Sequence, residues 1–333
     1  MPEAWWCLSW IWTTSKNFDP ERSGPGGTIL RGSSFLPRRI DWCRGGMCMK
    51  PILSILGGDM RQVYLARLLL EDGKDVITWG LEKGGAPKGV GLDQALRAGV
   101  LLLPLPVCRG GRLNLPLTDT ELEAGRLWPR LRYDQLLLGG MTGELSPRLM
   151  ADYGLTLLDY YDREETQAAN AVPTAEGAIQ LAMESTDRTI HGSRCLVIGY
   201  GRIGRLLADR LLALGAEVTV SARKYGDLAW IQAWGCRSVQ TGALTGRLER
   251  FDLIFNTAPA LILDGARLQE VREDCVVIDL ASAPGGVDLE EAKRLSRRAI
   301  HAPGLPGKAA PRTAAAAIRD SVYHILEERG EPI

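Results

Sequence analysis

Apolar and polar positions alternate in blocks that predict a first set of strands and helices. Short apolar runs of the kind that forms buried strands alternate with stretches whose apolar positions recur at helical spacing. We expect strands at residues 51–56, 75–79, 99–103, 135–138 and 156–159. We expect helices over 61–71 and 119–124, and a third that Ser146 opens with Pro147 in its first position.

A second set of strands and helices begins at Arg194. We expect strands at 195–198, 217–220, 253–256, 276–280 and 298–301, and a helix over 203–214. Two more helices flank this set, one over 174–184 with Pro173 near its start and one over 314–328. Because strands alternate with helices throughout, the pattern predicts an α/β protein with two doubly wound, Rossmann-like parallel sheets and a cleft between them.

The first 48 residues differ in composition from the rest and carry five of the nine tryptophans. They show no sustained helix or strand period. One hypothesis is that this stretch is upstream sequence translated from a wrong start, with the working protein beginning near Met47 or Met49. The alternative is a poorly ordered extension that docks through its tryptophans. We expect a substrate domain over 49–170, a linking helix and cofactor domain over 171–309, and a C-terminal helix over 310–333 that packs back on the first domain.

The charge and cysteine content exclude several classes of protein. Forty basic residues balance forty acidic ones, which argues against a nucleic-acid partner. No apolar run approaches the ~18–20 residues of a membrane span, so we expect no membrane partner. Seven cysteines without paired C-x-x-C spacing, and three histidines, favour reduced thiols in the cytoplasm and argue against a metal site.

A glycine-rich run directly follows an apolar strand and opens a helix, which is the context of a dinucleotide-binding loop. We expect Gly199 to permit the turn, Gly201 to admit the pyrophosphate and Gly204 to allow close packing. The helix N-terminus would offer free N–H groups to the phosphates. The alternative is a glycine turn in an empty sheet domain. The candidate cofactor residues of this run are Gly199, Tyr200, Gly201, Arg202, Ile203 and Gly204.

The next strand ends without an acidic residue. Enzymes selective for NAD usually carry Asp or Glu there to bind the ribose 2′-OH. Ser221, Arg223 and Lys224 occupy this position instead, and Arg223 would fork to the oxygens of a 2′-phosphate. We therefore predict NADP as the cofactor, with NAD as the alternative. Arg223 and Lys224 would otherwise form an ordinary solvated basic turn.

Two later strands end at the sheet edge where ligands bind in open α/β folds. Asn256 is a candidate for the ribose, and the backbone near Ala281 for the carboxamide of the nicotinamide. The candidate cofactor residues at these two ends are Asn256, Thr257, Ala258, Pro259, Asp279 and Ala281.

Several cations are candidates for binding a carboxylate. Lys308 and Arg312 follow a loop rich in proline and glycine and stand just before a helix, so a carboxylate there would meet two cations and a helix N-terminus. The alternative is a rigid linker with solvated charges. Arg61, at a strand end of the first domain, is a further candidate, and Arg109 and Arg112 are weaker ones.

Five segments together resemble the family formed by the dipicolinate synthase A subunits of spore-forming bacteria. The resemblance covers about residues 49–328, and this family is similar in architecture to D-2-hydroxyacid dehydrogenases and S-adenosylhomocysteine hydrolases. The segments are G-G-D-x-R at 57–61, N-A-V-P-T-A-E-G at 170–177, G-Y-G-R-I-G at 199–204, D-L-A-S-x-P-G-G-x-D at 279–288 and A-P-G-L-P-G-K at 302–308.

The resemblance implies that a dihydrodipicolinate is oxidised to dipicolinate (pyridine-2,6-dicarboxylate) and that a nicotinamide cofactor takes the electrons. The substrate would form from the aldol product of pyruvate and aspartate semialdehyde. The family also implies an oligomer with the flavoprotein-like B subunit of dipicolinate synthase, in the cytoplasm of the mother cell during sporulation. A dicarboxylate substrate needs at least two cationic anchors, for which Lys308, Arg312 and Arg61 are candidates.

The proton acceptor is not identifiable from the sequence. Glu176 and Asp59 are candidates, although either could cap a helix. His301, at a strand end, is a candidate acid–base group or a structural residue.

Two other functions stay open at this point. The chain could be a non-catalytic nucleotide-binding subunit that orders or regulates the flavoprotein. It could also be a D-2-hydroxyacid dehydrogenase acting alone, which would need a His–Glu pair and an arginine at the cleft, and His301 has no obvious Glu partner.

Overall fold

The computed structural model describes residues 43–44, 47–48, 52–282 and 284–331. The expectation about the start of the working protein rests on residues 1–48, of which 1–42 and 45–46 lie outside this range. Two short strands, β1 (Cys43–Arg44) and β2 (Met47–Cys48), pair antiparallel before the first large sheet begins. No described helix is long and apolar enough to cross a membrane.

The first large sheet has five parallel strands in the order β4-β3-β5-β8-β9. This is the 2-1-3-4-5 order of flavodoxin-like folds, in which the chain reverses direction across the sheet between the first and third strands. The strands are β3 (Leu53–Leu56), β4 (Val76–Trp79), β5 (Val100–Leu102), β8 (Leu136–Gly139) and β9 (Thr156–Asp159). The other elements are α1 (Met60–Glu71), η1 (Glu82–Gly84), α2 (Leu92–Ala95), β6 (Cys108–Arg109), β7 (Arg112–Leu113), α3 (Ala124–Leu127), η2 (Trp128–Arg130) and α4 (Leu145–Tyr153).

The second large sheet has six parallel strands in the order β12-β11-β10-β13-β14-β15. This is the 3-2-1-4-5-6 order of dinucleotide-binding domains, with its switch point between the first and fourth strands. The strands are β10 (Arg194–Ile198), β11 (Glu217–Ala222), β12 (Arg237–Gln240), β13 (Leu253–Asn256), β14 (Val276–Asp279) and β15 (Arg298–His301). The other elements are α6 (Arg202–Ala213), α7 (Tyr225–Ala233), η3 (Thr241–Ala243), η4 (Leu248–Arg250), α8 (Gly265–Glu270) and α9 (Leu289–Arg294).

Helices cover both faces of each sheet because successive strand residues point to opposite faces. In β10, Cys195 and Val197 join one buried cluster with α5, α6 and α7, whereas Leu196 and Ile198 join another with α8 and α9. In the first sheet, one face packs on α1 and the opposite face on α2, α3 and α4. The expected α/β class with two doubly wound parallel sheets is confirmed.

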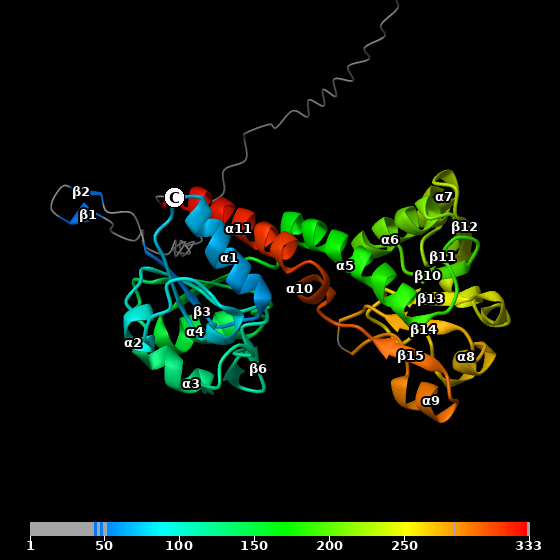
Figure 1. Ribbon diagram of the computed structural model, residues 1–333, viewed down its shortest axis with the longest axis horizontal. Helices are drawn as coiled ribbons and strands as arrows, with labels where there is room; N and C mark the ends of the chain where they lie inside the picture. Colours follow the sequence, from blue (N-terminus) through cyan, green and yellow to red (C-terminus); the bar gives the residue numbers. More distant parts are fainter. Residues whose placement is uncertain (1–42, 45–46, 49–51, 283, 332–333) are drawn as a thin grey trace, which may run out of the picture. The chain divides into compact units, whose positions relative to one another are not determined.

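Three further helices connect the two sheets (Figure 1). They are α5 (Glu164–Ser185), α10 (Leu305–Ala309) and α11 (Pro311–Glu328). Helix α5 contacts α6, α10 and α11, and α11 lies along α1. Ile318 and Val322 of α11 are buried in the same cluster as Leu65 and Leu69 of α1, so the C-terminal helix packs on the first domain.

The expected linking helix begins ten residues earlier than its apolar pattern indicated. Pro173 was expected near its start, but α5 begins at Glu164 and contains Pro173 in its interior. A proline normally interrupts a helix because it lacks an N–H group and crowds the preceding turn. Burial of Ala171, Ala175 and Ala178 against neighbouring helices overrides that local penalty. The helix crosses the boundary expected between residues 170 and 171, and the domain boundaries stay a prediction.

Two smaller expectations are wrong. Residues 119–123 are not helical, and α3 begins only at Ala124, because Leu122 accepts a backbone hydrogen bond from Leu113 and Glu123 bridges Arg112. Ser146 does not open a helix. Helix α4 begins one residue before it, and the Ser146 hydroxyl donates to the carbonyl oxygen of Leu157 at 2.6 Å.

Candidate functional site

The glycine loop (199–204) joins β10 to α6 and has two tightly packed glycines and one open glycine. A Cβ at Gly204 would lie 2.2 Å from the carbonyl oxygen of Gly199, and one at Gly199, where φ is +101°, would lie 2.6 Å from Thr257 Oγ1. A Cβ at Gly201 would meet no described atom within 4 Å. Gly199 and Gly204 therefore serve the fold, while Gly201 leaves room for a ligand to approach the backbone.

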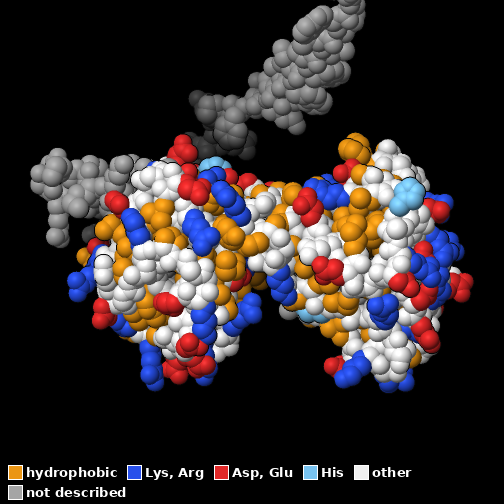
Figure 2. Space-filling view, viewed as in Figure 1, with side chains coloured by type: hydrophobic (Ala, Val, Ile, Leu, Met, Phe, Trp, Pro, Cys, Tyr) orange, Lys and Arg blue, Asp and Glu red, His pale blue; other side chains and the backbone are white. Residues whose placement is uncertain are grey.

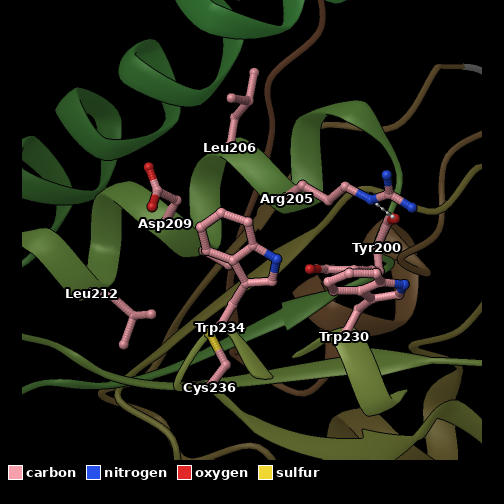
Figure 3. Close-up of a pocket in the computed structure, with 9 residues that line it drawn as sticks. Tyr200, Arg205, Leu206, Asp209, Leu212, Trp230, Trp234 and Cys236 are labelled. Atoms are coloured by element: carbon pink, nitrogen blue, oxygen red, sulfur yellow. Dashed lines mark hydrogen bonds between the residues drawn. The ribbon is translucent and has the colours of Figure 1, made fainter. Parts of the chain in front are cut away.

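The N-terminus of α6 is suited to bind phosphate. Its N-cap is Gly201, no side chain caps it, and its first turn has no acidic residue. The first N–H groups of a helix have no partner inside the helix, and their dipoles attract anions. Arg202, in this first turn, donates from Nε to Glu164 Oε1 at 2.8 Å. The guanidinium of Arg205 lies over the aromatic ring of Tyr200, with its central carbon 4.9 Å from the centre of that ring (Figure 3).

The end of β11 presents two free cations. Arg223 and Lys224 are exposed, and no described residue forms a side-chain hydrogen bond or ion pair with either. Ser221 does not belong to this exposed group, contrary to our expectation. It is fully buried, and its hydroxyl lies 3.4 Å from that of Thr241. Side chains alternate between the two faces of a strand, and that of Ser221 points to a covered face of the sheet.

The ends of β13 and β14 are tied together by a buried pair. Asn256 donates from Nδ2 to Asp279 Oδ1 at 2.7 Å and to the carbonyl oxygen of Ala258 at 3.0 Å. The Asp279 carboxylate also accepts from the backbone N–H groups of Ala281 and Gly286. Both side chains are buried. Asn256 therefore holds the loops in place, and its side chain does not face the site as expected for a ribose ligand.

Other predicted residues at these two strand ends are more accessible. Thr257 and Ala258 are half-buried and Pro259 is exposed. Thr257 packs against the glycine loop, where its hydroxyl donates to the carbonyl oxygen of Ile198 at 2.9 Å. Ala281 lines the cavity described next.

A cavity of about 250 Å³ lies between residues of the first sheet, α5 and the second sheet. It brings together segments that are far apart in the sequence, including Ile203 of the glycine loop. Its polar and charged lining residues are Arg61, Arg109, Tyr161, Asn170, Thr174 and Ser282. The rest of its apolar or backbone lining comes from Leu105, Pro106, Met141, Leu280, Ala281, Ala302, Pro303, Gly304, Leu305 and Pro306.

The two arginines of this cavity differ in their partners. Arg61 is 6% exposed and its guanidinium binds Asp59, with Nε 2.9 Å from Oδ1 and Nη2 2.8 Å from Oδ2. Its Nη2 also donates to the carbonyl oxygen of Leu105 at 2.6 Å. Arg109 is exposed and has no hydrogen-bond or ion-pair partner among the described side chains. Arg109 is therefore the better placed cation, although the sequence ranked it lower.

Lys308 and Arg312 occupy different places from those expected. Lys308 lies within α10, not in a loop, and is exposed. Arg312 lies in the first turn of α11, 3.5 Å from Glu71. Neither lines the cavity. The expectation that both stand just before one helix is wrong, because the two residues lie in separate helices, each with a proline in its first two positions.

Neither candidate proton acceptor lines the cavity. Asp59 accepts from the backbone N–H of Arg61 at 3.0 Å and forms a capping box with Gln62, which confirms the capping alternative. Glu176 is exposed on α5 and lies 3.4 Å from Arg210 Nε. It does not stand at a helix start, because α5 begins at Glu164.

His301 ends β15 beside the buried pair of β13 and β14. Its Nδ1 lies 3.7 Å from Asp279 Oδ2, and a third of its side chain is exposed. The carboxylate partner that the sequence did not reveal is therefore Asp279, from the neighbouring strand. No hydrogen bond joins the two groups at this distance, and His301 does not line the cavity.

Sequence reasoning missed several polar lining residues of the cavity. Asn170 donates from Nδ2 to the Tyr161 hydroxyl at 3.3 Å, and Thr174 donates to the carbonyl oxygen of Asn170 at 2.8 Å. The N-A-V-P-T segment contains two of these residues and was the available signal, but only the path of α5 places them here.

Four cysteines, Cys108, Cys195, Cys236 and Cys275, are free thiols that are poorly suited to nucleophilic chemistry. Burial raises the pKa of Cys108, beside Arg109, to about 11, and raises that of Cys195 to about 12. The thiol form is therefore the dominant one near neutral pH. Among the described residues, no three His, Cys, Asp or Glu side chains cluster as metal ligands would.

Comparisons with known proteins agree with the fold. The family model for the N-terminal domain of the dipicolinate synthase A subunit matches residues 53–161. The model for the NAD-binding domain of D-isomer specific 2-hydroxyacid dehydrogenases matches residues 160–290. The chain is 32% identical over 286 residues to the dipicolinate synthase A subunit of Bacillus subtilis (strain 168), covering 83% of this chain and 96% of that relative.

Two solved structures have the same architecture over most of the chain. The dipicolinate synthase A subunit from Bacillus halodurans superposes with a TM-score of 0.76 at 30% identity, covering 84% of this chain and 99% of that one. The A chain of dipicolinate synthase from Bacillus subtilis gives 0.74 at 29%, covering 85% and 98%. The second domain is thus an NAD(P)-binding domain of the dehydrogenase type, and the chain belongs to the family of dipicolinate synthase A subunits.

Proposed function

We propose that this chain oxidises a dihydrodipicolinate to dipicolinate with NADP as the hydride acceptor, acting in the cytoplasm with the flavoprotein-like B subunit of dipicolinate synthase. The observation that carries the proposal is the cavity that joins Ile203 of the glycine loop to Arg109 and the polar face of α5. A small ring held there would lie between the cofactor domain and a free cation. The membership in the family of dipicolinate synthase A subunits supplies the substrate class.

The residues around the glycine loop fit a dinucleotide. Gly201 leaves its backbone approachable and α6 has no side-chain cap, so the pyrophosphate would lie at that helix N-terminus. Arg223 and Lys224 are free to bind a 2′-phosphate. The nicotinamide, when bound, supplies the hydride acceptor.

Within the cavity, the chain's own residues would bind and orient the substrate. Arg109 would bind one carboxylate by paired N–H donors, and Ser282 and Asn170 would donate to the other polar atoms. No carboxylate or imidazole lines the cavity among the described residues. The reaction removes a hydride and a proton and creates an aromatic ring. Orientation would therefore contribute most of the catalysis, with the proton leaving to water.

A second candidate function is favoured by the charge of the cavity. The substrate has two carboxylates, whereas Arg61 is already neutralised by Asp59 and Arg109 is the one free cation among the described lining residues. A non-catalytic nucleotide-binding subunit would need no second anchor. In that case the flavoprotein-like B subunit would hold the reacting ring.

The test follows NADPH absorbance with the aldol product of pyruvate and aspartate semialdehyde generated in the cuvette. The wild-type chain and its Arg109→Ala variant are assayed with and without the B subunit. We expect NADPH with the wild type, and for the variant a loss of about 10- to 100-fold, typical of a charged hydrogen bond, with NADP affinity retained. Dipicolinate formed in the presence of the B subunit but without NADPH would overturn the proposal and favour the binding subunit.

A further inference from the structure

Met141, two residues after the end of β8, has a backbone conformation that favours glycine. Its φ is +56°, in the left-handed region that bulky residues rarely adopt. Conformations of this kind persist only where the surrounding structure imposes them, and they concentrate at ligand-binding sites. Two questions follow for Met141: what holds its backbone, and what its side chain faces.

A carboxylate of the neighbouring strand holds the backbone of Met141. Asp159, at the end of β9, accepts from the N–H groups of Met141 at 3.2 Å and Thr142 at 2.7 Å. The same carboxylate accepts from the N–H groups of Tyr161 at 2.8 Å and Asp162 at 3.2 Å. Four N–H groups on one charged acceptor tie the turn after β8 to the end of β9.

The two glycines before Met141 leave this turn little room to shift. A Cβ at Gly139 would lie 2.4 Å from the side chain of Val107, and one at Gly140 would lie 2.5 Å from that of Leu105. The turn is thus packed closely against the residues that follow β5. Met141 is the first residue after β8 with a side chain exposed to solvent.

The side chain of Met141 is 53% exposed and lines the cavity of about 250 Å³. Hydrophobic side chains are exposed at several other places among charged ones (Figure 2), and single residues of this kind need no explanation. Met141 differs because a strained backbone and a cavity coincide there. The first domain also gives Leu105 and Pro106 to the lining, but these are buried and half-buried. Met141 therefore has the most apolar surface left to cover on that side.

A planar ring in this cavity has two faces with different requirements. Hydride transfer turns one face toward the nicotinamide, and the cofactor domain lines its side of the cavity with Ala281 and Ser282. The opposite face is stabilised by an apolar group that excludes water. Methionine suits that place, because its side chain is flexible and its sulfur makes favourable contacts with aromatic rings.

We propose that Met141 covers the face of the substrate ring that is turned away from the nicotinamide. The inference rests on the proposed function, since that reaction supplies the ring. Arg109 would then bind a carboxylate at the edge of the ring, and Met141 would hold the ring toward the cofactor. An open-chain dicarboxylate offers no flat face to Met141, so this contact favours a ring over such a compound.

The test is Met141→Gly, for which relief of strain and loss of the contact have opposite effects. Glycine adopts positive φ without steric cost, so the urea midpoint of unfolding should rise. In the NADPH assay, KM for the aldol-derived substrate should rise about tenfold or more while kcat changes less than about threefold, because the contact exists before and during the reaction. Dipicolinate binding to the NADP-loaded chain, measured by calorimetry, should weaken by a similar factor. Met141→Leu keeps an apolar side chain and should stay within about threefold of the wild type.

Lys88→Gly is the matched control, because Lys88 has a φ of +52°, is exposed and does not line the cavity. It should raise the urea midpoint without changing KM or the affinity for dipicolinate. If Met141→Gly does not fold, judged by circular dichroism, Met141→Asn replaces it with the same expected loss, since asparagine tolerates positive φ.

A more stable Met141→Gly variant with unchanged KM and unchanged affinity for dipicolinate would overturn the inference, because the strain would then serve the fold alone. A wild-type chain that binds no dipicolinate would overturn it as well. A wild-type chain that forms no NADPH, but binds dipicolinate more tightly than Met141→Gly does, would refute the proposed reaction and still support the ring contact.

Discussion

Helices α1 and α6 hold equivalent places in the two sheets and differ at their N-termini. Each follows the first strand of its sheet through a glycine turn. Helix α1 is capped by Asp59 and Gln62, and α11 covers it. Helix α6 has no side-chain cap. Helix α5 packs along it, as α11 packs along α1.

The comparison shows that the same strand–turn–helix unit can have two different roles. In α1 the carboxylate of Asp59 occupies the place a phosphate would take, and it also neutralises Arg61. In α6 the same place is open, and the next strand ends in the free cations Arg223 and Lys224. An anion is attracted to an uncapped helix N-terminus and repelled by a capping carboxylate. The first domain is therefore not a second phosphate site despite its glycine turn.

The largest expected effect is that of Gly204→Ala. The added Cβ would lie 2.2 Å from the carbonyl oxygen of Gly199, so the glycine loop must shift away from α6. Such overpacking costs about 1–3 kcal/mol of stability, and NADP affinity should fall at least about 100-fold because the loop moves. Urea unfolding and a fluorescence titration with NADP measure the two effects. Gly125→Ala in α3, where a Cβ meets no described atom within 4 Å, is the control, and equal behaviour of the two variants would contradict the assigned role.

The next largest effect is expected for Arg223→Asp, which tests the cation that follows β11 in the cofactor domain. Loss of a charged hydrogen bond and the new repulsion should weaken NADP binding by about 10- to 100-fold. Binding of NAD should be maintained or improved, because an acid there suits the ribose 2′-OH. Arg247→Asp, at another exposed arginine of the same domain without a described partner, should leave both affinities unchanged. Parallel losses for both cofactors would show that Arg223 does not read the 2′-phosphate.

A smaller effect is expected for Gly201→Asp, which makes α6 resemble α1. Asp is a good N-cap, so the free energy of unfolding should rise by a few tenths of a kcal/mol. The carboxylate would stand where phosphate binds, and NADP affinity should fall about tenfold or more. Gly201→Ala adds the Cβ without the charge, so it should weaken NADP binding less than the Asp variant, and the difference between the two variants measures the effect of the carboxylate. Unchanged NADP binding in the Asp variant would mean that phosphate does not approach this N-terminus.

The smallest effect is expected for Asp59→Asn, which keeps the cap of α1 but removes its charge. Asn caps a helix about as well as Asp, so the loss reflects the ion pair with the nearly buried Arg61, about 1 kcal/mol of unfolding free energy. Asp264→Asn, at the exposed cap of α8, is the matched control and should cost less. With the charge of Arg61 released, substrate binding should tighten. Equal stabilities for the two variants would argue against the pair.

The cofactor site was largely readable from the sequence, and the substrate site was not. The glycine loop is a contiguous run whose spacing reflects local turn geometry, so Gly199, Gly201 and Gly204 could be assigned roles directly. Ser221 and Asn256 were placed on the surface because a strand end does not reveal which face each residue takes. Lys308 and Arg312 were grouped because α10, which contains Lys308, is too short to show a period.

Local patterns by themselves determined the alternation of strands and helices, the dinucleotide loop and the family resemblance. These features depend on neighbours in the chain, through backbone geometry and side-chain alternation. Tertiary structure alone decided that α5 continues through Pro173, that Asp59 neutralises Arg61 and that Asp279 faces His301. It also decided that Arg109 is the free cation among the described residues of the cavity lining. Each of these depends on groups brought together from distant positions, where packing and charge pairing outweigh local preference.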